Sequence, residues 1–262
     1  MWPRKHKKLG IALGSGSARG LAHVGVLKVL VAEGLAPEVV TGTSMGAVVG
    51  SLYAAGYSPD EIDGIARGFD IKSLVSLADV TIRGGALLSG EKVEAFLRKH
   101  LPATFEELSL PFGCVSTDLA QGGRVVHRSG DLVQAVRASL SIPLVFMPVR
   151  ENEQILVDGF LTDPIPVSLA RDLGADVVAA VNVCGAGRLE SGADGGNDGG
   201  MLKDLHAALR GEGPRNRGTS GLEVVAATME VMERYIAAPA LESADIVITP
   251  EVGEFAGYQF LS

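Results

Sequence analysis

The 262-residue chain is poor in aromatic residues and in cysteine. Aromatic residues make up 5% of the chain, whereas hydrophobic residues make up 47% and are mostly Val, Leu, Ala and Ile. This composition favours buried parallel strands covered by helices over a β-sandwich, and the length suits one large α/β domain. The two cysteines, Cys114 and Cys184, lie in apolar, strand-like runs without metal-ligand spacing, so we interpret them as buried reduced thiols.

The chain also lacks an excess of positive charge and long apolar runs. Its net charge is -8, and an acidic chain without a basic stripe is a poor candidate for binding nucleic acid. One basic cluster, at residues 4–8, is either a solvated N-terminus or a contact for anionic lipid. No segment resembles a signal peptide or reaches the roughly 18 to 20 apolar residues of a membrane span. We therefore expect a cytoplasmic protein whose membrane contact, if any, is peripheral to the inner face.

Strand-like and helix-like segments alternate along the chain, which is typical of α/β folds with parallel sheets. Ser58 and Glu61 have the spacing of a capping box, which marks the start of one helix. Short apolar runs predict strands at 9–13, 39–41, 113–118, 124–127, 145–150, 155–157, 176–183 and 243–249. Helical spacing predicts helices at 19–33, 45–55, 89–100, 131–140 and 166–173.

One segment, residues 185–220, breaks this alternation because ten of its 36 residues are glycine. Such a segment buries too little apolar surface to offset the entropy lost on ordering. Within it only residues 201–210 have the pattern of a helix. We interpret the segment as a flexible surface insertion, with a mobile lid over an active site as the alternative.

The sharpest motif is Gly42-Thr43-Ser44-Met45-Gly46, which follows a predicted strand and precedes a predicted helix. A G-x-S-x-G motif in this context is typical of a nucleophilic serine on a tight turn. The turn needs glycine two residues before and two residues after the serine, because side chains there would collide. We expect the Ser44 hydroxyl to rise out of the sheet towards solvent. The alternative is a serine that only caps the helix.

A second glycine-rich motif, Gly14-Ser15-Gly16-Ser17-Ala18-Arg19-Gly20, also lies between a predicted strand and a predicted helix. Backbone N–H groups of such a loop can bind an anion. A dinucleotide site would need a third glycine where Arg19 stands, and a phosphate loop would need a Gly-Lys-Ser/Thr ending, which is absent. An oxyanion hole is the better interpretation, with the N–H groups stabilising a tetrahedral intermediate.

Asp158 ends a predicted strand and is followed by Gly159, so its carboxylate can face a cleft. From spacing alone, a simple turn aspartate remains the more common interpretation. Of the chain's histidines, only His206 follows Asp158, and it lies in the glycine-rich segment, so a Ser-Asp-His triad is a poor match. A carboxylate acting directly on Ser44 is the simpler hypothesis, and we interpret His23 as structural.

The chain resembles the patatin-like phospholipase family in its short bacterial form. The resemblance rests on IALGSGSARGLAHVGVLKVL, VVTGTSMGAVVGSLYAAG, VRASLSIPLVFMPV and ILVDGFLTDPIPV, with ADIVITPEV as a closing strand. It implies a three-layer α/β/α domain over residues 8–262, with a mainly parallel central sheet and the insertion at 185–220. It also implies a Ser44–Asp158 dyad, with Arg19 at the Lys/Arg position of the oxyanion loop. Two departures are Ser15 and Ser17 in place of glycines, and Phe160 in place of Gly or Ala.

The resemblance implies a serine lipid acyl hydrolase of the phospholipase, lysophospholipase or esterase type, acting on a lipid or acyl ester through an acyl-enzyme. It implies no metal and no organic cofactor, and it leaves the oligomeric state open. One rival is a transacylase with the same dyad, in which an alcohol replaces water. The other is a non-catalytic regulatory protein that keeps the fold, which Ser15, Ser17 and Phe160 favour.

Overall fold

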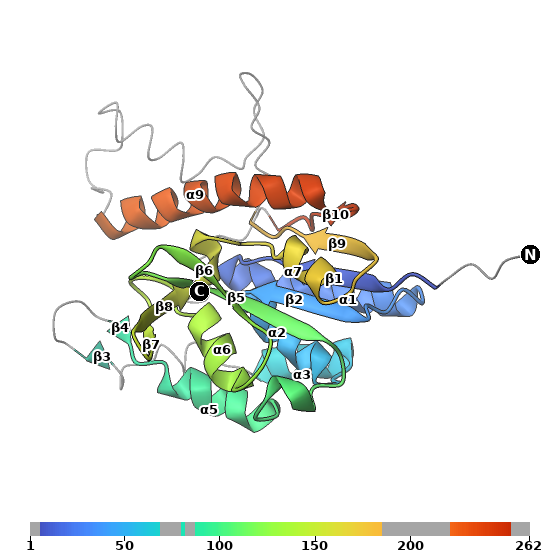
Figure 1. The fold of residues 1–262 in the computed structure, drawn as a ribbon, viewed down its shortest axis with the longest axis horizontal. Helices are drawn as coiled ribbons and strands as arrows, with labels where there is room; N and C mark the ends of the chain where they lie inside the picture. Colours follow the sequence, from blue (N-terminus) through green and yellow to red (C-terminus); the bar gives the residue numbers. More distant parts are fainter. Residues whose placement is uncertain (1–5, 69–79, 82–86, 185–220, 253–262) are drawn as a thin grey trace, which may run out of the picture.

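A computed structural model describes residues 6–68, 80–81, 87–184 and 221–252. Its centre is an eight-stranded sheet in the order β10-β9-β1-β2-β5-β8-β7, with β6 also paired to β5 (Figure 1). The strands are β1 (Leu9–Leu13), β2 (Val39–Thr43), β5 (Phe112–Asp118), β6 (Gly123–His127), β7 (Val149–Glu151), β8 (Gln154–Asp158), β9 (Val177–Val181) and β10 (Ile246–Ile248). A separate antiparallel pair consists of β3 (Val80–Thr81) and β4 (Leu87–Leu88).

The sheet is parallel from β10 to β5 and antiparallel beyond it. Strand β1 lies between β2 and β9 and is parallel to both, whereas β6 and β8 run antiparallel to β5. Leu13, the last residue of β1, pairs with Gly42 near the end of β2. Because the carboxyl ends of parallel strands lie at one edge of the sheet, the segments after β1 and β2 stand side by side. These segments contain the two glycine-rich motifs.

Helices α1 (Ala22–Ala32), α2 (Met45–Ala54), α5 (Glu91–His100) and α6 (Leu132–Ser139) cover one face of the sheet (Figure 1). Helix α3 (Pro59–Gly68) packs against α1 and α2. The larger hydrophobic core lies between these helices and β1, β2 and β5. Its fully buried members include Ile11, Leu13, Leu27, Val40, Leu97 and Leu132.

Helices α7 (Val167–Asp172) and α9 (Gly221–Ser243) cover the opposite face, so the fold is the expected three-layer α/β/α sandwich. A smaller core lies there, in which Ala12, Ala180 and Ala237 are buried. No helix was predicted at 221–243, so α9 is an addition to the sequence analysis. The described ranges also contain the short 3-10 helices η1 (Ser17–Leu21), η2 (Phe105–Glu107) and η3 (Gly159–Leu161).

Most predicted elements are confirmed within a few residues, and so is the capping box. The Ser58 N–H donates to Glu61 Oε2 at 2.8 Å, and the Glu61 N–H donates to Ser58 Oγ at 3.3 Å. Cys114 and Cys184 are free and buried, as predicted. The insertion at 185–220, with its predicted helix at 201–210, lies outside the described residues.

Three predicted elements are wrong in part. The strand predicted at 243–249 shrinks to β10, because α9 continues to Ser243. The helix predicted at 19–33 is divided into η1 and α1, because the glycine-rich loop enters it through a tighter turn. The strand predicted at 145–150 shrinks to β7, which begins at Val149. Pro148 has no N–H to give to a strand ladder, and Leu144 has a φ of 69°, outside the extended region.

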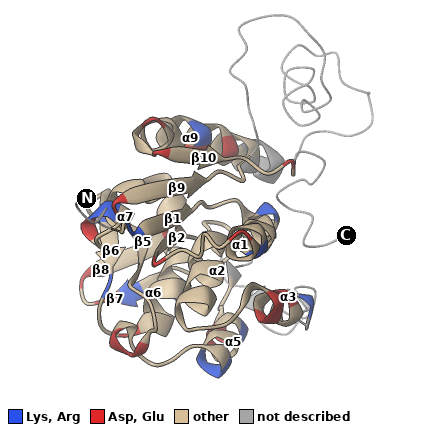
Figure 2. Ribbon diagram, turned by 90° about the vertical axis from the view of Figure 1, so that its right-hand side faces the viewer, with Lys and Arg blue, Asp and Glu red and all other residues tan. Residues whose placement is uncertain are grey.

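Charged side chains lie mainly on outer helices such as α3, α5 and α9, while the strands carry few (Figure 2). Of the N-terminal basic cluster, His6 pairs with Glu38 at 2.7 Å, and Arg4 and Lys5 lie outside the described ranges. Across the described part of the chain, no helix combines the length and the hydropathy needed to cross a membrane.

The packing of α2 against β1 predicts that Gly46→Ala destabilises the fold. A Cβ atom at Gly46 would lie 2.2 Å from the carbonyl oxygen of Leu13, so the backbone would have to move. Such overpacking costs about 1–3 kcal/mol. Gly64→Ala in α3 is the matched control, because its Cβ would meet open space and alanine is the better helix former. Thermal melting should show a lower Tm than wild type for Gly46→Ala and no decrease for Gly64→Ala. A Gly46→Ala variant that melts at the wild-type Tm would contradict the described packing.

Candidate active site

Ser44 occupies a strained turn between β2 and α2. Its φ of 58° and ψ of -123° lie outside the regions that side-chain-bearing residues favour. A Cβ atom at Gly42 would lie 2.3 Å from the carbonyl oxygen of Gly46, and one at Gly46 would touch the backbone of β1. Both glycines are therefore required for this turn, as the sequence analysis predicted. The geometry matches a nucleophile elbow.

The Gly14–Gly20 loop passes directly beside this turn. A Cβ atom at Gly20 would lie 2.5 Å from Cβ of Met45, the residue after Ser44. Gly16 has a φ of 156° and Ser17 a φ of 50°, so the loop bends sharply at these two residues. The N–H groups of Gly14, Ser15 and Arg19 donate to the carbonyl oxygens of Val181, Pro164 and Gly16.

Three N–H groups in the middle of the loop remain available. Within the described part of the chain, those of Gly16, Ser17 and Ala18 have no hydrogen-bond partner. They precede or open the short helix η1, where N–H groups lack intrahelical acceptors. An anion or a developing oxyanion could accept from them.

His23 supports the start of the Gly14–Gly20 loop through a hydrogen bond. It is completely buried, and its Nε2 lies 2.7 Å from the carbonyl oxygen of Gly14. Burial lowers the pKa of His23 to about 4, so the ring is neutral near pH 7 and Nε2 donates its hydrogen to that oxygen. The structural interpretation of His23 is confirmed.

Asp158 lies at the end of β8, completely buried. Its backbone N–H donates to the carbonyl oxygen of Ser141, and its Oδ1 accepts the N–H of Phe160 at 3.0 Å. Gly159 is needed next to it, because a Cβ atom there would lie 2.3 Å from the carbonyl oxygen of Val115. Oδ2 is buried and has no partner with hydrogen-bond geometry among the described residues.

Burial raises the pKa of Asp158 from 3.8 to about 8. The Ser44 side chain and the Phe160 N–H lower this pKa by interacting with the carboxylate, while the charge of Glu233 raises it further. The structure thus brings Asp158 and Ser44 together, although 114 positions separate them in the sequence. A carboxylate with so high a pKa is suited to accept a proton near neutral pH.

The end of α6 holds both of these residues. Ser139 Oγ accepts the backbone N–H of Ser44 at 2.9 Å, and the Ser141 carbonyl accepts that of Asp158 at 3.0 Å. Arg137 is buried and donates to Ser141 Oγ at 2.7 Å. The sequence analysis assigned no role to these three residues. Their signal was available, because VRASLSIP places polar residues in a segment that is otherwise apolar.

Both candidate catalytic residues are less exposed than the sequence suggested. Ser44 is 2% exposed, so the expectation that its hydroxyl faces solvent is wrong. Phe160, one of the two departures from the family pattern, is 6% exposed and lies in η3 directly after Asp158 and Gly159. Water is therefore largely excluded from around Ser44 and Asp158, which strengthens electrostatic interactions there.

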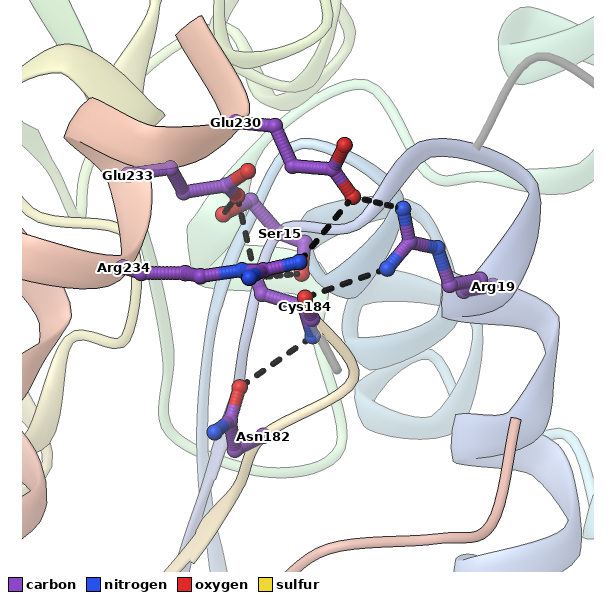
Figure 3. Close-up of polar contacts among 7 residues, drawn as sticks. All are labelled: Ser15, Arg19, Asn182, Cys184, Glu230, Glu233 and Arg234. Carbon is purple, nitrogen blue, oxygen red and sulfur yellow. Dashed lines mark hydrogen bonds and ion pairs between the residues drawn. The ribbon is translucent and has the colours of Figure 1, made fainter. Parts of the chain in front are cut away.

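Arg19 points towards α9 and the segment after β9 (Figure 3). Its Nη1 donates to the carbonyl oxygen of Cys184 at 3.1 Å, and its Nη2 forms an ion pair with Glu230. Its side chain therefore anchors the loop to α9 and to the segment after β9. Glu230 and Glu233 were not predicted, although two glutamates three residues apart in an apolar helix are a recognisable signal.

None of the described histidines hydrogen-bonds to Ser44. His127 contacts Ser116 Oγ at 2.7 Å, and burial lowers its pKa to about 4. His206 lies outside the described residues. No group of three or more His, Cys, Asp or Glu side chains within the described ranges is arranged to hold a metal ion.

Comparisons with known proteins identify relatives of this chain. A family model described as patatin-like phospholipase matches residues 11–171. An uncharacterized NTE family protein of Mycobacterium tuberculosis is 33% identical over 230 residues, which cover 87% of this chain and 61% of the relative. The lysophospholipase NTE1 of Pyricularia oryzae is 33% identical over 181 residues, covering 68% of this chain and 12% of that protein. The crystal structure of VipD from Legionella pneumophila has a TM-score of 0.48 and 16% identity, covering 79% of this chain and 53% of VipD. The chain thus spans 61% of the length of its mycobacterial relative.

The raised pKa of Asp158 predicts a pH-dependent effect of Asp158→Asn on stability. The folded protein keeps this proton up to a pH of about 8, whereas the unfolded chain loses it near 3.8. Between these values the folded state binds more protons, so the contribution of Asp158 to the free energy of unfolding falls as pH rises. The amide has no proton to lose. The Tm of Asp158→Asn should therefore increase relative to wild type between about pH 4 and about pH 8, and then level off.

The control is Asp172→Asn, at an exposed position at the end of α7. Its Tm should stay parallel to that of the wild type over the same range. A Tm difference for Asp158→Asn that does not change with pH would show that Asp158 ionises normally in the folded protein.

Proposed function

Because the chain belongs to the patatin-like phospholipase family, we propose that it is a lipid acyl hydrolase in which Ser44 and Asp158 form the catalytic dyad. The observation that carries the proposal is the buried Asp158 carboxylate interacting with the side chain of Ser44 on its strained turn. The family supports lipid hydrolysis, and the geometry of this chain supports the assignment of the dyad.

In the first step, Asp158 accepts the proton of the Ser44 hydroxyl as Oγ attacks the acyl carbonyl carbon. The carbonyl oxygen becomes an oxyanion, which accepts hydrogen bonds from the free N–H groups of Gly16 and Ser17. The bond to the leaving alcohol then breaks, and that alcohol takes the proton from Asp158. An acyl-enzyme on Ser44 remains.

In the second step, Asp158 accepts a proton from water, whose oxygen attacks the acyl-enzyme. The ester bond to Ser44 breaks, the proton returns to Ser44 Oγ, and a carboxylic acid leaves. The same N–H groups stabilise this second oxyanion. If an alcohol replaces water, the product is a new ester, so the same residues support transacylation.

The relatives suggest which substrate to test first. One relative is named a lysophospholipase, so a lysophospholipid is the natural candidate for this chain. We propose that the protein meets such lipids by peripheral contact with a membrane or micelle surface.

Ser44→Ala should abolish hydrolysis of a soluble p-nitrophenyl ester and of a lysophospholipid, and it should abolish labelling by a fluorophosphonate probe. Asp158→Asn should lower turnover about 10²- to 10⁴-fold, because the amide cannot accept the proton. Since Asp158 must be deprotonated to act, kcat/KM of the wild type should rise with pH and level off above about 8. Ser129→Ala, at an exposed loop position, is the control and should keep full activity.

Three outcomes would count against the proposal or redirect it. A wild-type protein that neither hydrolyses the esters nor reacts with the probe would favour a non-catalytic regulatory role. Full activity of Ser44→Ala, with an unchanged Tm, would contradict the assignment of Ser44 and Asp158 as the catalytic dyad. Transfer of the acyl group to an added alcohol in preference to water would favour a transacylase.

A further inference from the structure

One carboxylate of α9, that of Glu233, contacts the first part of the Gly14–Gly20 loop. Glu233 Oε1 accepts a hydrogen bond from Ser15 Oγ, the hydroxyl on the second residue of the Gly14–Gly20 loop (Figure 3). The same oxygen accepts from Cys184 Sγ at 3.1 Å, and Cys184 Sγ also lies 3.1 Å from the Ser15 carbonyl oxygen. Ser15, Cys184 and Glu233 thus form a closed set of contacts.

A second contact pins the other end of the loop to the same helix. Arg19 pairs with Glu230, one turn before Glu233 in α9, and Arg234 lies 3.7 Å from Glu230. Helix α9 therefore grips the loop at Ser15 and at Arg19. The free N–H groups of Gly16, Ser17 and Ala18 lie between these two points.

The position of Glu233 is costly for a carboxylate. Burial raises its pKa above 4.5, while the hydrogen bonds from Ser15 and Cys184 lower it. An apolar side chain could pack α9 onto the sheet without this desolvation cost. A carboxylate, unlike an apolar side chain, accepts a directional hydrogen bond. Its oxygen therefore fixes the position of the Ser15 hydroxyl and, with it, of the loop backbone.

We propose that Glu233 is a positioning residue that, through Ser15, holds the Gly14–Gly20 loop with its free N–H groups aimed at the reacting carbonyl. The inference rests on the proposed function for its catalytic meaning. It also explains Ser15, one of the two serines that replace glycines of the family pattern. A glycine has no hydroxyl, whereas Ser15 offers α9 a group to hold.

The test compares Glu233→Gln, which keeps an acceptor oxygen for Ser15, with Glu233→Leu, which keeps similar bulk and removes the acceptor. Glu242→Leu, at an exposed position of α9, is the matched control. Ser15→Ala alone, and combined with Glu233→Leu, tests whether the two residues act as a pair. Two quantities are measured for each variant: hydrogen–deuterium exchange of the loop peptide, and kcat and KM on a soluble p-nitrophenyl ester.

Glu233→Leu should speed exchange at residues 14–20 and lower kcat about 10- to 100-fold, with KM changed by less than about threefold, because misplaced donors weaken transition-state binding. Glu233→Gln, which keeps an acceptor oxygen, should retain the slow exchange of the wild type and most of its kcat. Ser15→Ala should change exchange and kcat as Glu233→Leu does. Because the two residues act as a pair, the kcat of the double variant should lie within about twofold of that of Glu233→Leu.

The exchange measurement separates this inference from the proposed function. If the wild type proves inactive but Glu233→Leu still loosens residues 14–20 and Glu233→Gln does not, the positioning contact stands and the hydrolase proposal fails. If the wild type is active and Glu233→Leu leaves both exchange and kcat at wild-type values, the inference is overturned. It is equally overturned if Glu233→Gln is as damaging as Glu233→Leu, or if Glu242→Leu has the same effect as Glu233→Leu.

Discussion

The carboxylate of Asp158 is buried away from water, and the proposed chemistry of the surrounding site depends on this desolvation. A charged carboxylate at the same place would be strongly disfavoured without partners, so its pKa rises and its interaction with Ser44 becomes valuable. The fold surrounds it with backbone groups instead of a cation. The N–H of Phe160 donates to the carboxylate, and the carbonyl of Ser141 accepts the backbone N–H of Asp158, so its geometry is fixed without neutralising its charge. A lysine or arginine in their place would lower its pKa and weaken it as a base.

The same logic governs the rest of the site, which is built mainly from backbone groups held by neutral contacts. His23 is kept neutral and supports the loop by its hydrogen bond to Gly14. Ser139 holds the Ser44 backbone with a hydroxyl. Charged groups do occur close by: Arg137 supports the site from α6 through Ser141, and a cluster of Arg19, Glu230 and Glu233 lies on the α9 side of the loop. The proposed reaction centre and the ionic cluster are therefore separated by the glycine-rich loop itself.

Sequence patterns predicted what local geometry determines. Glycines around Ser44, the capping box at Ser58 and the apolar run of β9 each have a signature within a few residues. Contacts across long sequence separations left no such signature. Ser15 and Glu233 are 218 residues apart, and Ser44 and Ser139 are 95 apart, so no window of the sequence contains both partners. The strand predicted at 145–150 was too long because an apolar run was weighed more heavily than Pro148 within it.

The position of β1 in the sheet has a consequence for the order in which the chain can fold. Strand β1 is made before both of its neighbours, β2 and β9, and Leu9 pairs with Val177. During synthesis at about 5–20 residues per second, Ser15 waits roughly 10 to 40 s for Glu233 to leave the ribosome. Until β9 has emerged, one edge of β1 is unpaired, and until α9 has emerged, the glycine-rich loop has no helix to hold it. A nascent chain of this kind cannot hold the glycine-rich loop in place before α9 has emerged, so the proposed site would be completed only late in synthesis.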